Sequence, residues 1–487
     1  MKDMPFSKKI GLFLIFLQLV ATVLFLISIV TLGMVPDVYV AVIAAVMGVL
    51  LVLIGLIQWI SKKKAIISKV ISFFITAFLL IVSFYLFKTG NAVASISTTD
   101  NIKVDKIVVA VLEDDPAQTI EDAAEYTFGV QYVLKGEEIK KAIETIETIL
   151  GKTIQKKEYS DLQEQIKKLY SGEVQAVIID EAYIEMLDEE ITDVSGGLRI
   201  IYIDEVKSEV QTVPERENLE IKTDAFIVYV SGIDVYGPIK TNSRSDVNIL
   251  MVVNPTTHKI LLVTTPRDFY IPFPGVTGGK RDKLTHAGIY GVDVSMAALG
   301  QLYDIQPDFY ARVNFTSLIK VVNALGGVKV YSEASFKQVI DGEVTYVSKG
   351  WNYFNGEQAL AFCRERKQLS DGDYQRGKNQ EAVLKAIIEK ILSPAVLKGA
   401  NGLLDSVKGN IETNMSMEQI QELVKSQLND PQSWSIDMMA ASGRGDSNYC
   451  YSMPGTKLYV SWPDEVSVKA IKNAIEEVMN YYVEPAS

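Results

Sequence analysis

The sequence predicts three transmembrane helices followed by a larger exported part with an α/β fold. Residues 10–32, 38–60 and 70–87 are apolar and carry no charged side chain. After residue 100, strand-like and helix-like patterns alternate, which is typical of α/β architectures. Charge divides the chain of 487 residues at the same place. Residues 1–92 hold eight lysines and two aspartates and are basic, whereas the net charge of the whole chain is −12, so the part after residue 92 is strongly acidic.

The three apolar stretches match the thickness of a bilayer, since a membrane-spanning helix needs about 20 apolar residues. We expect residues 1–92 to form a membrane anchor. A cleaved signal peptide is the alternative for the first stretch, but the stretch is long and no small-residue cleavage site follows it.

Lysines set the expected orientation of the anchor. Lys2, Lys8 and Lys9 precede the first span, and a Lys62–Lys64 loop joins the second and third, whereas only Asp37 lies between the first two. The positive-inside rule places the lysine-bearing segments in the cytoplasm. The sequence therefore predicts a multi-pass protein of the cell membrane, with a cytoplasmic N-terminus and an extracellular catalytic domain.

Residues 100–215 are expected to form a small α/β accessory domain. This segment contains no His, no Cys and no glycine-rich phosphate loop, so no chemistry is assigned to it. Periodicity predicts its strands at 103–112, 174–179 and 198–203, and its helices at 136–149 and 159–169.

Residues 222–487 are expected to form a second α/β domain, an αβα sandwich with its core motifs in 222–395. The turn at 254–258 predicts a hairpin between two of its strands. The expected strands are 225–230, 247–253, 259–265, 309–313 and 328–331, and the helices are 292–303, 315–325, 355–364 and 374–392. A further helix at 416–428, a hairpin at 434–460 and a helix at 465–480 follow.

Arginines suggest where chemistry takes place in this domain. Arg267 directly follows a strand, and the carboxyl ends of strands line ligand sites in α/β sheets. Arg364 and Arg366 are two residues apart, so they share one side of an extended segment and the helix before them is expected to end near Cys363. Paired guanidinium groups suit phosphate binding. A surface salt-bridge cluster is the alternative.

Two further groups of polar residues qualify as site candidates. Asp373, Arg376 and Gln380 fall on one helical stripe, which is also the pattern of a solvated helix face. Asp234 and Asp246 flank a short polar loop and could hold one Mg²⁺, although paired aspartates are also common in turns. Spacing alone leaves these readings open.

Seven ordered motifs resemble the LytR-CpsA-Psr family over residues 222–395. They are SGID at 231–234, SRSDVNILMVVNP at 243–255, TTPRDFY at 264–270, KLTHAGIYG at 283–291, NFTSLIKVVNALGGV at 314–328, NGEQALAFCRER at 355–366 and DYQRGKNQ at 373–380. The three-span anchor and the accessory domain resemble the streptococcal, CpsA-like branch of capsule systems.

The resemblance implies a phosphotransferase that attaches an undecaprenyl-pyrophosphate-linked glycopolymer, expected to be capsular polysaccharide, to peptidoglycan outside the cell. Its partners would be the membrane, this lipid-linked polysaccharide, peptidoglycan and other capsule-assembly proteins. Asp234 and Asp246 would hold Mg²⁺ or Mn²⁺. The implied catalytic residues are Asp246, Arg267, Arg364 and Arg366, and the implied substrate-binding residues are Arg244, Arg267, Arg364, Arg366, Asp373, Arg376 and Gln380.

Two details follow from this resemblance. The polyprenyl tail would need an apolar channel, for which the helices at 292–302, 315–325 and 383–392 are candidate walls, with ordinary core packing as the alternative. Many relatives also have an arginine just before the final glutamine of the last motif. Here the stretch is Lys378-Asn379-Gln380, so Lys378 would supply that charge. Its ammonium group would act as a point charge, whereas a guanidinium group can bind phosphate with two parallel hydrogen bonds.

Other functions are weighed against transfer. A non-catalytic scaffold that binds the lipid would need the same site, and pyrophosphate hydrolysis would use water as the acceptor. Direct DNA binding is not expected, because the exported part is acidic and little of the chain faces the cytoplasm. Cys363 and Cys450 are too few for a disulfide framework and are expected to be free buried thiols, with pairing as the alternative.

Overall fold

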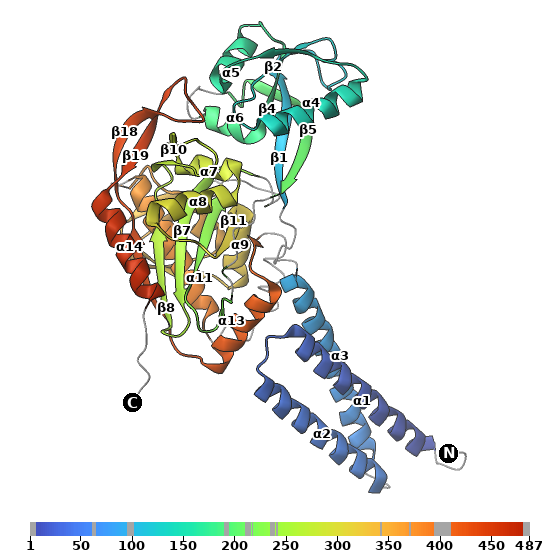
Figure 1. The fold of residues 1–487 in the computed structure, drawn as a ribbon. Helices are drawn as coiled ribbons and strands as arrows, with labels where there is room; N and C mark the ends of the chain where they lie inside the picture. Colours follow the sequence, from blue (N-terminus) through green and yellow to red (C-terminus); the bar gives the residue numbers. More distant parts are fainter. Residues whose placement is uncertain are drawn as a thin grey trace.

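The computed structural model describes residues 6–60, 65–94, 102–188, 194–209, 216, 218–233, 239, 242–340, 343–369, 372–393 and 411–480. Three long helices stand apart from the rest of the chain (Figure 1). They are α1 (Phe6–Leu32), α2 (Asp37–Ile60) and α3 (Ala65–Ala94). All three are long and apolar enough to cross a membrane, which confirms the three predicted spans.

Polar contacts join helices of the anchor to one another, and both apolar and polar contacts join the anchor to the folded part. Ser72 of α3 donates a hydrogen bond of 2.6 Å to Gln18 of α1, the kind of contact that joins helices in lipid. At the other end of α1, Leu32 and Met34 lie in an apolar cluster with helix α13 (Met417–Asn429). The apolar surface of the anchor is thereby continuous with that of the large domain.

The accessory segment forms a five-stranded mixed sheet in the order β3-β2-β4-β1-β5. Its apolar core lies between the sheet and α4, whose buried face includes Ile139, Ile143 and Ile146. The elements are β1 (Ile102–Leu112), β2 (Thr127–Val130), α4 (Gly136–Leu150), β3 (Gln155–Glu158), α5 (Leu162–Tyr170), β4 (Ala176–Asp180), α6 (Glu181–Asp188) and β5 (Leu198–Glu209). The sequence analysis missed β2, β3 and α6.

The large domain is built on a six-stranded sheet in the order β16-β11-β6-β7-β8-β17. Strands β6, β7 and β8 are antiparallel neighbours, whereas β11 runs parallel to β6, and β17 runs parallel to β8. The strands are β6 (Phe226–Ile233), β7 (Ser245–Asn254), β8 (Lys259–Thr264), β11 (Phe309–Asn314), β16 (Ile411–Thr413) and β17 (Ser435–Ala440).

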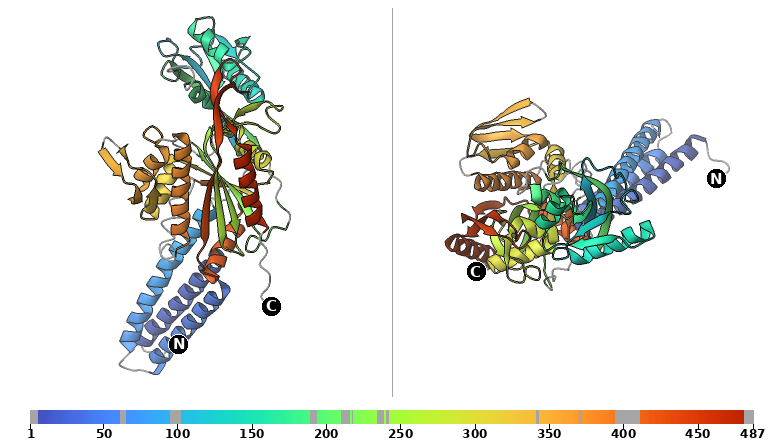
Figure 2. Two further views of the ribbon diagram at one scale, coloured as in Figure 1. Left: turned by 90° about the vertical axis from the view of Figure 1, so that its left-hand side faces the viewer. Right: turned by 90° about the horizontal axis from the view of Figure 1, so that it is seen from above.

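Helices cover both faces of this sheet, as the predicted αβα sandwich requires (Figure 2). Alternation along β8 shows how: Leu261 and Val263 face the cluster formed with α7, α8 and α14, whereas Ile260 and Leu262 face α11 and α13. The helices are α7 (Leu284–Tyr290), α8 (Val292–Tyr303), α11 (Asp373–Ile391) and α14 (Glu465–Met479).

A satellite unit packs on the outer side of α11. It consists of α9 (Phe315–Ala324), α10 (Gly356–Arg364), and the two-stranded sheets β12 (Val328–Ser332) with β15 (Gly350–Phe354) and β13 (Phe336–Ile340) with β14 (Glu343–Val347). Asn355 is the N-cap of α10 and accepts a hydrogen bond from the backbone of Gln358. This unit has its own apolar cluster, with Phe362 at its centre.

One sequence expectation was wrong. The hairpin predicted over 434–460 does not form, because β17 joins the large sheet beside β8, and the hairpin is instead made by β18 (Gly443–Tyr449) and β19 (Lys457–Pro463). The helices at 292–302, 315–325 and 383–392, predicted as walls of an apolar channel, contribute to different apolar clusters. The first faces the α14 side of the sheet, the second belongs to the satellite unit, and only the third reaches the cluster beside α13.

Candidate active site

Asp246 occupies a β-bulge at the start of β7. Ile233 pairs with Ser245 and Gly232 pairs with Val247, so Asp246 is the extra residue with no partner on β6. A bulge re-aims one side chain out of the regular alternation, and bulges are common beside active sites. The close approach requires glycine at position 232, because a Cβ there would lie 2.5 Å from Cγ2 of Val247.

Buried hydroxyl groups hold this bulge from behind. The Tyr229 hydroxyl donates to Oδ1 of Asn248 over 2.7 Å, and it lies 2.8 Å from the Ser245 hydroxyl, which is itself 2.9 Å from that of Ser231. The side-chain amide of Asn248 donates to the carbonyl of Ser245 over 2.8 Å. These groups are buried, so the network fixes the backbone that carries Asp246.

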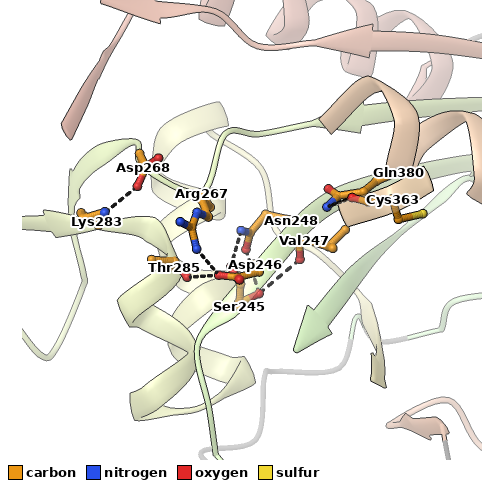
Figure 3. A network of polar contacts seen from close by, with 10 residues as sticks. All are labelled: Ser245, Asp246, Val247, Asn248, Arg267, Asp268, Lys283, Thr285, Cys363 and Gln380. Carbon is orange, nitrogen blue, oxygen red and sulfur yellow. Dashed lines mark hydrogen bonds and ion pairs between the residues drawn. The ribbon is translucent and has the colours of Figure 1, made fainter. Parts of the chain in front are cut away.

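Arg267 and Thr285 both bind Asp246 (Figure 3). Nη1 of Arg267 donates to Oδ1 of Asp246 over 3.0 Å, and the Thr285 hydroxyl donates to the same oxygen over 2.8 Å. Arg267 lies just after β8, and the Thr285 amide at the start of α7 donates to the Arg267 carbonyl over 2.8 Å. Lys283 and Asp268 form a neighbouring ion pair of 2.7 Å.

Positive charge controls the ionisation of Asp246. Burial by itself would raise the pKa of this carboxyl, but the charges of Arg267, Arg244 and Arg376, with the Thr285 hydrogen bond, hold the pKa well below its usual range. Asp246 is therefore a carboxylate at all physiological pH values, surrounded by guanidinium groups.

Helix α11 closes the other side of the site. Arg376 and Gln380, one turn apart, line a small pocket with Asp246 and Arg267, as the predicted helical stripe requires. Gln380 also donates a hydrogen bond of 3.3 Å to the Cys363 carbonyl at the end of α10. The pocket measures about 20 Å³, which is room for one water molecule, so a pyrophosphate would sit at its mouth rather than inside it.

Arg364 and Arg366 lie at the end of α10, which terminates at Arg364, one residue later than expected. Both side chains are exposed. The Arg364 guanidinium lies 4.5 Å from the ring centroid of Phe315, a cation–π distance. Neither arginine lines the pocket at Asp246.

The remaining predicted site residues are placed unequally. Arg244 is buried, two residues before Asp246, and its charge acts on that carboxylate. Asp234 lies outside the described residues. Asp373 is the first residue of α11, but its side chain also lies outside the described part. Within the described ranges, no group of three or more His, Cys, Asp or Glu side chains is arranged to hold a metal ion.

Lys378 does not substitute for the missing arginine at the Asp246 pocket. Its ammonium group lies 3.7 Å from a carboxylate oxygen of Glu333, on the side of α11 that faces the satellite unit. The positive charge expected there is thus directed toward another surface.

His286 and the cysteines have structural roles. Nδ1 of His286 lies 2.7 Å from Oδ1 of Asp282 and 3.0 Å from the Ser452 hydroxyl, all three side chains being buried. Because Ser452 and Asp282 share one ring nitrogen, this is no catalytic triad. Cys363 and Cys450 are free and buried, and burial raises the pKa of Cys363 to about 12.

Sequence reasoning missed two residues of the site. Thr285 binds Asp246, and Tyr374 lines the pocket while its hydroxyl donates to the Gly443 carbonyl over 2.9 Å. Both lie inside motifs that were singled out, KLTHAGIYG and DYQRGKNQ. Their hydroxyl groups carry no charge, so residue type alone did not mark them as site candidates in the way that it marked the arginines.

Comparisons with known proteins agree with the motifs. The model of the LytR_cpsA_psr family matches residues 201–467, more than half of the chain. The polyisoprenyl-teichoic acid--peptidoglycan teichoic acid transferase TagU of Bacillus cereus is 34% identical over 205 residues, 42% of this chain and 65% of that protein. TagT of Bacillus subtilis, named for the same activity, is 34% identical over 217 residues, 43% of this chain and 66% of that protein.

The chain thus spans slightly less than two thirds of the length of these curated relatives. Among solved structures, a crystal structure of B. subtilis TagV is similar with a TM-score of 0.45 and 25% identity, covering 54% of this chain and all of that one.

Proposed function

The chain belongs to the LytR-CpsA-Psr family, and from that premise we propose that it transfers a glycopolymer from a polyprenyl-pyrophosphate lipid to peptidoglycan. The observation that carries the proposal is the cluster of guanidinium groups around the ionised Asp246. The names of the relatives, which are polyisoprenyl-teichoic acid--peptidoglycan transferases, support the same reaction class.

The reaction builds negative charge where this cluster lies. A hydroxyl of the acceptor glycan attacks the sugar-linked phosphorus, the new P–O bond forms, and the bond to the lipid phosphate breaks. The lipid phosphate leaves with the extra negative charge, and the hydroxyl proton passes to solvent or to a base. Arg267 and Arg376 at the pocket, with Arg364 and Arg366 just after the Cys363 carbonyl that Gln380 binds, would neutralise the phosphoryl oxygens.

An apolar path supports delivery of a lipid substrate. Leu384, Ile388 and Leu392 of α11 pack with Leu423 of α13 in the cluster under the sheet. The same α13 packs its Ile420 and Val424 against Leu32 and Leu86 of the anchor. We propose that the polyprenyl chain follows this surface from the bilayer to the pyrophosphate site at the start of α11.

Asp246 suits a cation ligand better than a general base. A carboxylate whose pKa lies far below neutrality accepts a proton poorly, whereas general bases work best with a pKa near the operating pH. Arg267 and Thr285 both bind Oδ1, which leaves Oδ2 as the oxygen we propose for Mg²⁺. Asp234 would be the second ligand, and the cation would supply further positive charge to the pyrophosphate.

Localisation and polymer are part of the proposal. The lysines that flank the anchor support a cytoplasmic N-terminus and an extracellular site. The three-span layout favours capsular polysaccharide as the polymer, whereas the curated relatives are named for teichoic acid.

Transfer by the full chain in lipid nanodiscs tests the function. Polyprenyl-pyrophosphate donors that carry either a capsular repeat or a teichoic acid unit would be incubated with peptidoglycan fragments, with Mg²⁺, with Mn²⁺ or with EDTA. We expect metal-dependent product that Asp246→Asn abolishes. Donor binding without product, across both donors, would favour the lipid-binding scaffold, and free lipid phosphate without glycan product would favour hydrolysis.

A further inference from the structure

A second hollow lies on the other side of α11 from the pyrophosphate pocket. It is a groove of about 260 Å³ between α11, the β12–β15 sheet and the edge strand β17. Successive residues of α11 divide between the two hollows: Gln375 and Asn379 line the groove, whereas Arg376 and Gln380 line the pocket. Both hollows include Ala440 of β17, so the groove adjoins the site of chemistry.

Exposed aromatic side chains form one wall of the groove. Tyr331 and Trp351 pair across the β12–β15 ladder on its outward face, with ring centroids 5.4 Å apart. Trp351 remains 62% exposed and Tyr331 47% exposed. Lys329 on the same face holds its ammonium group 4.9 Å from the Trp351 ring. This wall offers an aromatic platform with positive charge beside it.

Polar groups of α11 form the opposite wall. Glu381 is only 2% exposed, yet its Oε1 has no hydrogen-bond partner among the described residues. Burial raises the pKa of Glu381 to about 8, so near neutrality this carboxyl is a neutral group that can donate or accept. Lys378 and Lys385 line the same wall. Gln375 and Asn379 add side-chain amides to this wall.

We propose that this groove, between Trp351 and α11, binds the glycan strand of the peptidoglycan acceptor and presents its hydroxyl to the pyrophosphate site. The inference rests on the proposed transferase function and names the acceptor subsite. A sugar ring presents a C–H face that stacks on an aromatic ring, and hydroxyl and N-acetyl groups at its edge that bind amide and carboxyl side chains. The groove supplies both kinds of contact.

Charge and position favour the acceptor over the donor lipid as occupant. The polyprenyl chain requires a continuous apolar surface, whereas this groove combines aromatic, methionine and alanine side chains with lysine, glutamate, glutamine and asparagine side chains. Peptidoglycan strands carry carboxylates on their stem peptides. Of the lysines that line the groove, Lys378 is paired with Glu333 and Lys385 donates to the Ile436 carbonyl, so Lys329 beside Trp351 is the one we propose for these carboxylates. The donor phosphates belong at the arginines on the other side of α11, so a strand in the groove meets them from the opposite direction.

Binding of a soluble peptidoglycan fragment to the full chain in nanodiscs tests this subsite without any chemistry. The fragment is an uncross-linked glycan strand with stem peptides, followed by calorimetry. We expect Trp351→Ala and Lys329→Ala each to raise its Kd about tenfold or more. Tyr346→Ala is the matched control, because Tyr346 is 68% exposed with Lys337 5.6 Å from its ring, but lies on the neighbouring β13–β14 sheet outside the groove.

Steady-state transfer then separates acceptor from donor. We expect Trp351→Ala to raise the KM for the peptidoglycan fragment by a similar factor, with kcat and the KM for the lipid donor unchanged. A raised donor KM instead would assign the groove to the donor polymer and overturn the proposal, as would unchanged fragment binding by both variants. Trp351-dependent binding in a chain that transfers nothing would refute the transferase function while leaving the glycan site standing.

Discussion

Arg267 and Asp246 form a buried ion pair, with Nη1 and Oδ1 3.0 Å apart and side chains that are 8% and 11% exposed. Each charge compensates part of the other in a site largely removed from water, so removing either destabilises its partner. The pair also joins two parts of the sheet, because Asp246 opens β7 and Arg267 follows β8. The two residues should therefore act as one unit.

We expect Arg267→Ala to lower the transfer rate by about 100-fold or more, the usual cost of removing one charge-stabilising group from an active site. Asp246→Asn should cost a similar factor, and the double variant should cost little more than either alone. Initial rates with saturating donor measure this. Arg281→Ala is the control, since its guanidinium lies against Trp462 outside the pocket and its loss should change the rate little. Strictly multiplicative effects would show that the pair does not act as a unit.

Gly232 is expected to be essential for the bulge that directs Asp246. A methyl group there would meet Val247 at 2.5 to 2.6 Å, which real Cβ contacts do not reach, so β6 and β7 must separate locally. Gly232→Ala should reduce transfer at least tenfold while the protein still folds, as circular dichroism would report. Adding Val247→Gly removes the clashing side chain and should restore part of the activity. Full activity of Gly232→Ala alone would mean that the bulge does not position Asp246.

Much of this architecture could be predicted from periodicity, because the strands and helices of the large sheet bury regular apolar faces. Helix α8 was predicted at its observed bounds, and α11 within one residue at each end. The predicted hairpin over 434–460 does not form, because β17 does not pair with the strand that follows it in sequence. It pairs instead with β8, which is distant in sequence but adjacent in the folded sheet. Local pattern cannot rank these two pairings.

The site was predictable in its charges but not in its geometry. Arg267, Arg376 and Gln380 were chosen by residue type and spacing, and all three line the pocket with Asp246. The bulge at Asp246 was not predictable, because it depends on a register shift between β6 and β7 that leaves no mark on hydropathy. The network through Tyr229 was missed for the same reason: in sequence it is one more aromatic residue of a buried strand.

Stability should fall as pH rises from about 4.5 to about 8, in part because of Glu381. Burial raises its pKa to about 8 from an ordinary 4.5, against the smaller opposing effects of the Met439 amide, Thr264, Lys385 and Lys378. The folded chain then keeps a proton that the unfolded chain releases, so this contribution is complete below pH 4.5 and lost by pH 8.

Glu381→Gln tests this, since glutamine cannot release that proton. Between pH 6 and pH 8 the wild-type chain should lose on the order of 2 kcal/mol through Glu381, and the variant should lose correspondingly less. Thermal unfolding in detergent at the two pH values gives the comparison. Asp180, whose pKa burial raises to about 7, acts in the same direction and should leave a residual slope in the variant. Equal slopes for both proteins would show that Glu381 is ionised in the folded chain.

A buried polar contact joins the accessory segment to the loop that precedes the site. Lys135 and Asp105 form an ion pair of 2.7 Å with side chains 4% and 0% exposed, and the Asn242 amide donates to the same carboxylate oxygen over 2.8 Å. The Asn242 backbone also donates to the Val104 carbonyl over 3.1 Å. Asn242 lies two residues before Arg244, so the accessory sheet fixes the entrance to β7.

Lys135→Met should destabilise the folded chain by about 3–5 kcal/mol, because it leaves the buried charge of Asp105 without its compensating ammonium group. Lys135→Met combined with Asp105→Asn should recover most of that loss, since no unpaired charge remains and an amide can still contact Asn242. Lys140→Met is the matched control: its ion pair with Glu137 measures 2.8 Å but is 56% and 77% exposed, so its loss should change stability little.

Hydrogen exchange distinguishes a local role from a global one. If the contact positions the entrance to β7, then Asn242→Ala should speed exchange at the amides of 242–248 and lower transfer several-fold, while exchange in α4 and β1 stays unchanged. Faster exchange throughout the accessory sheet would instead mean that Asn242 stabilises that unit as a whole. Unchanged exchange at 242–248 with unchanged transfer would show that the accessory segment does not position Arg244 and Asp246.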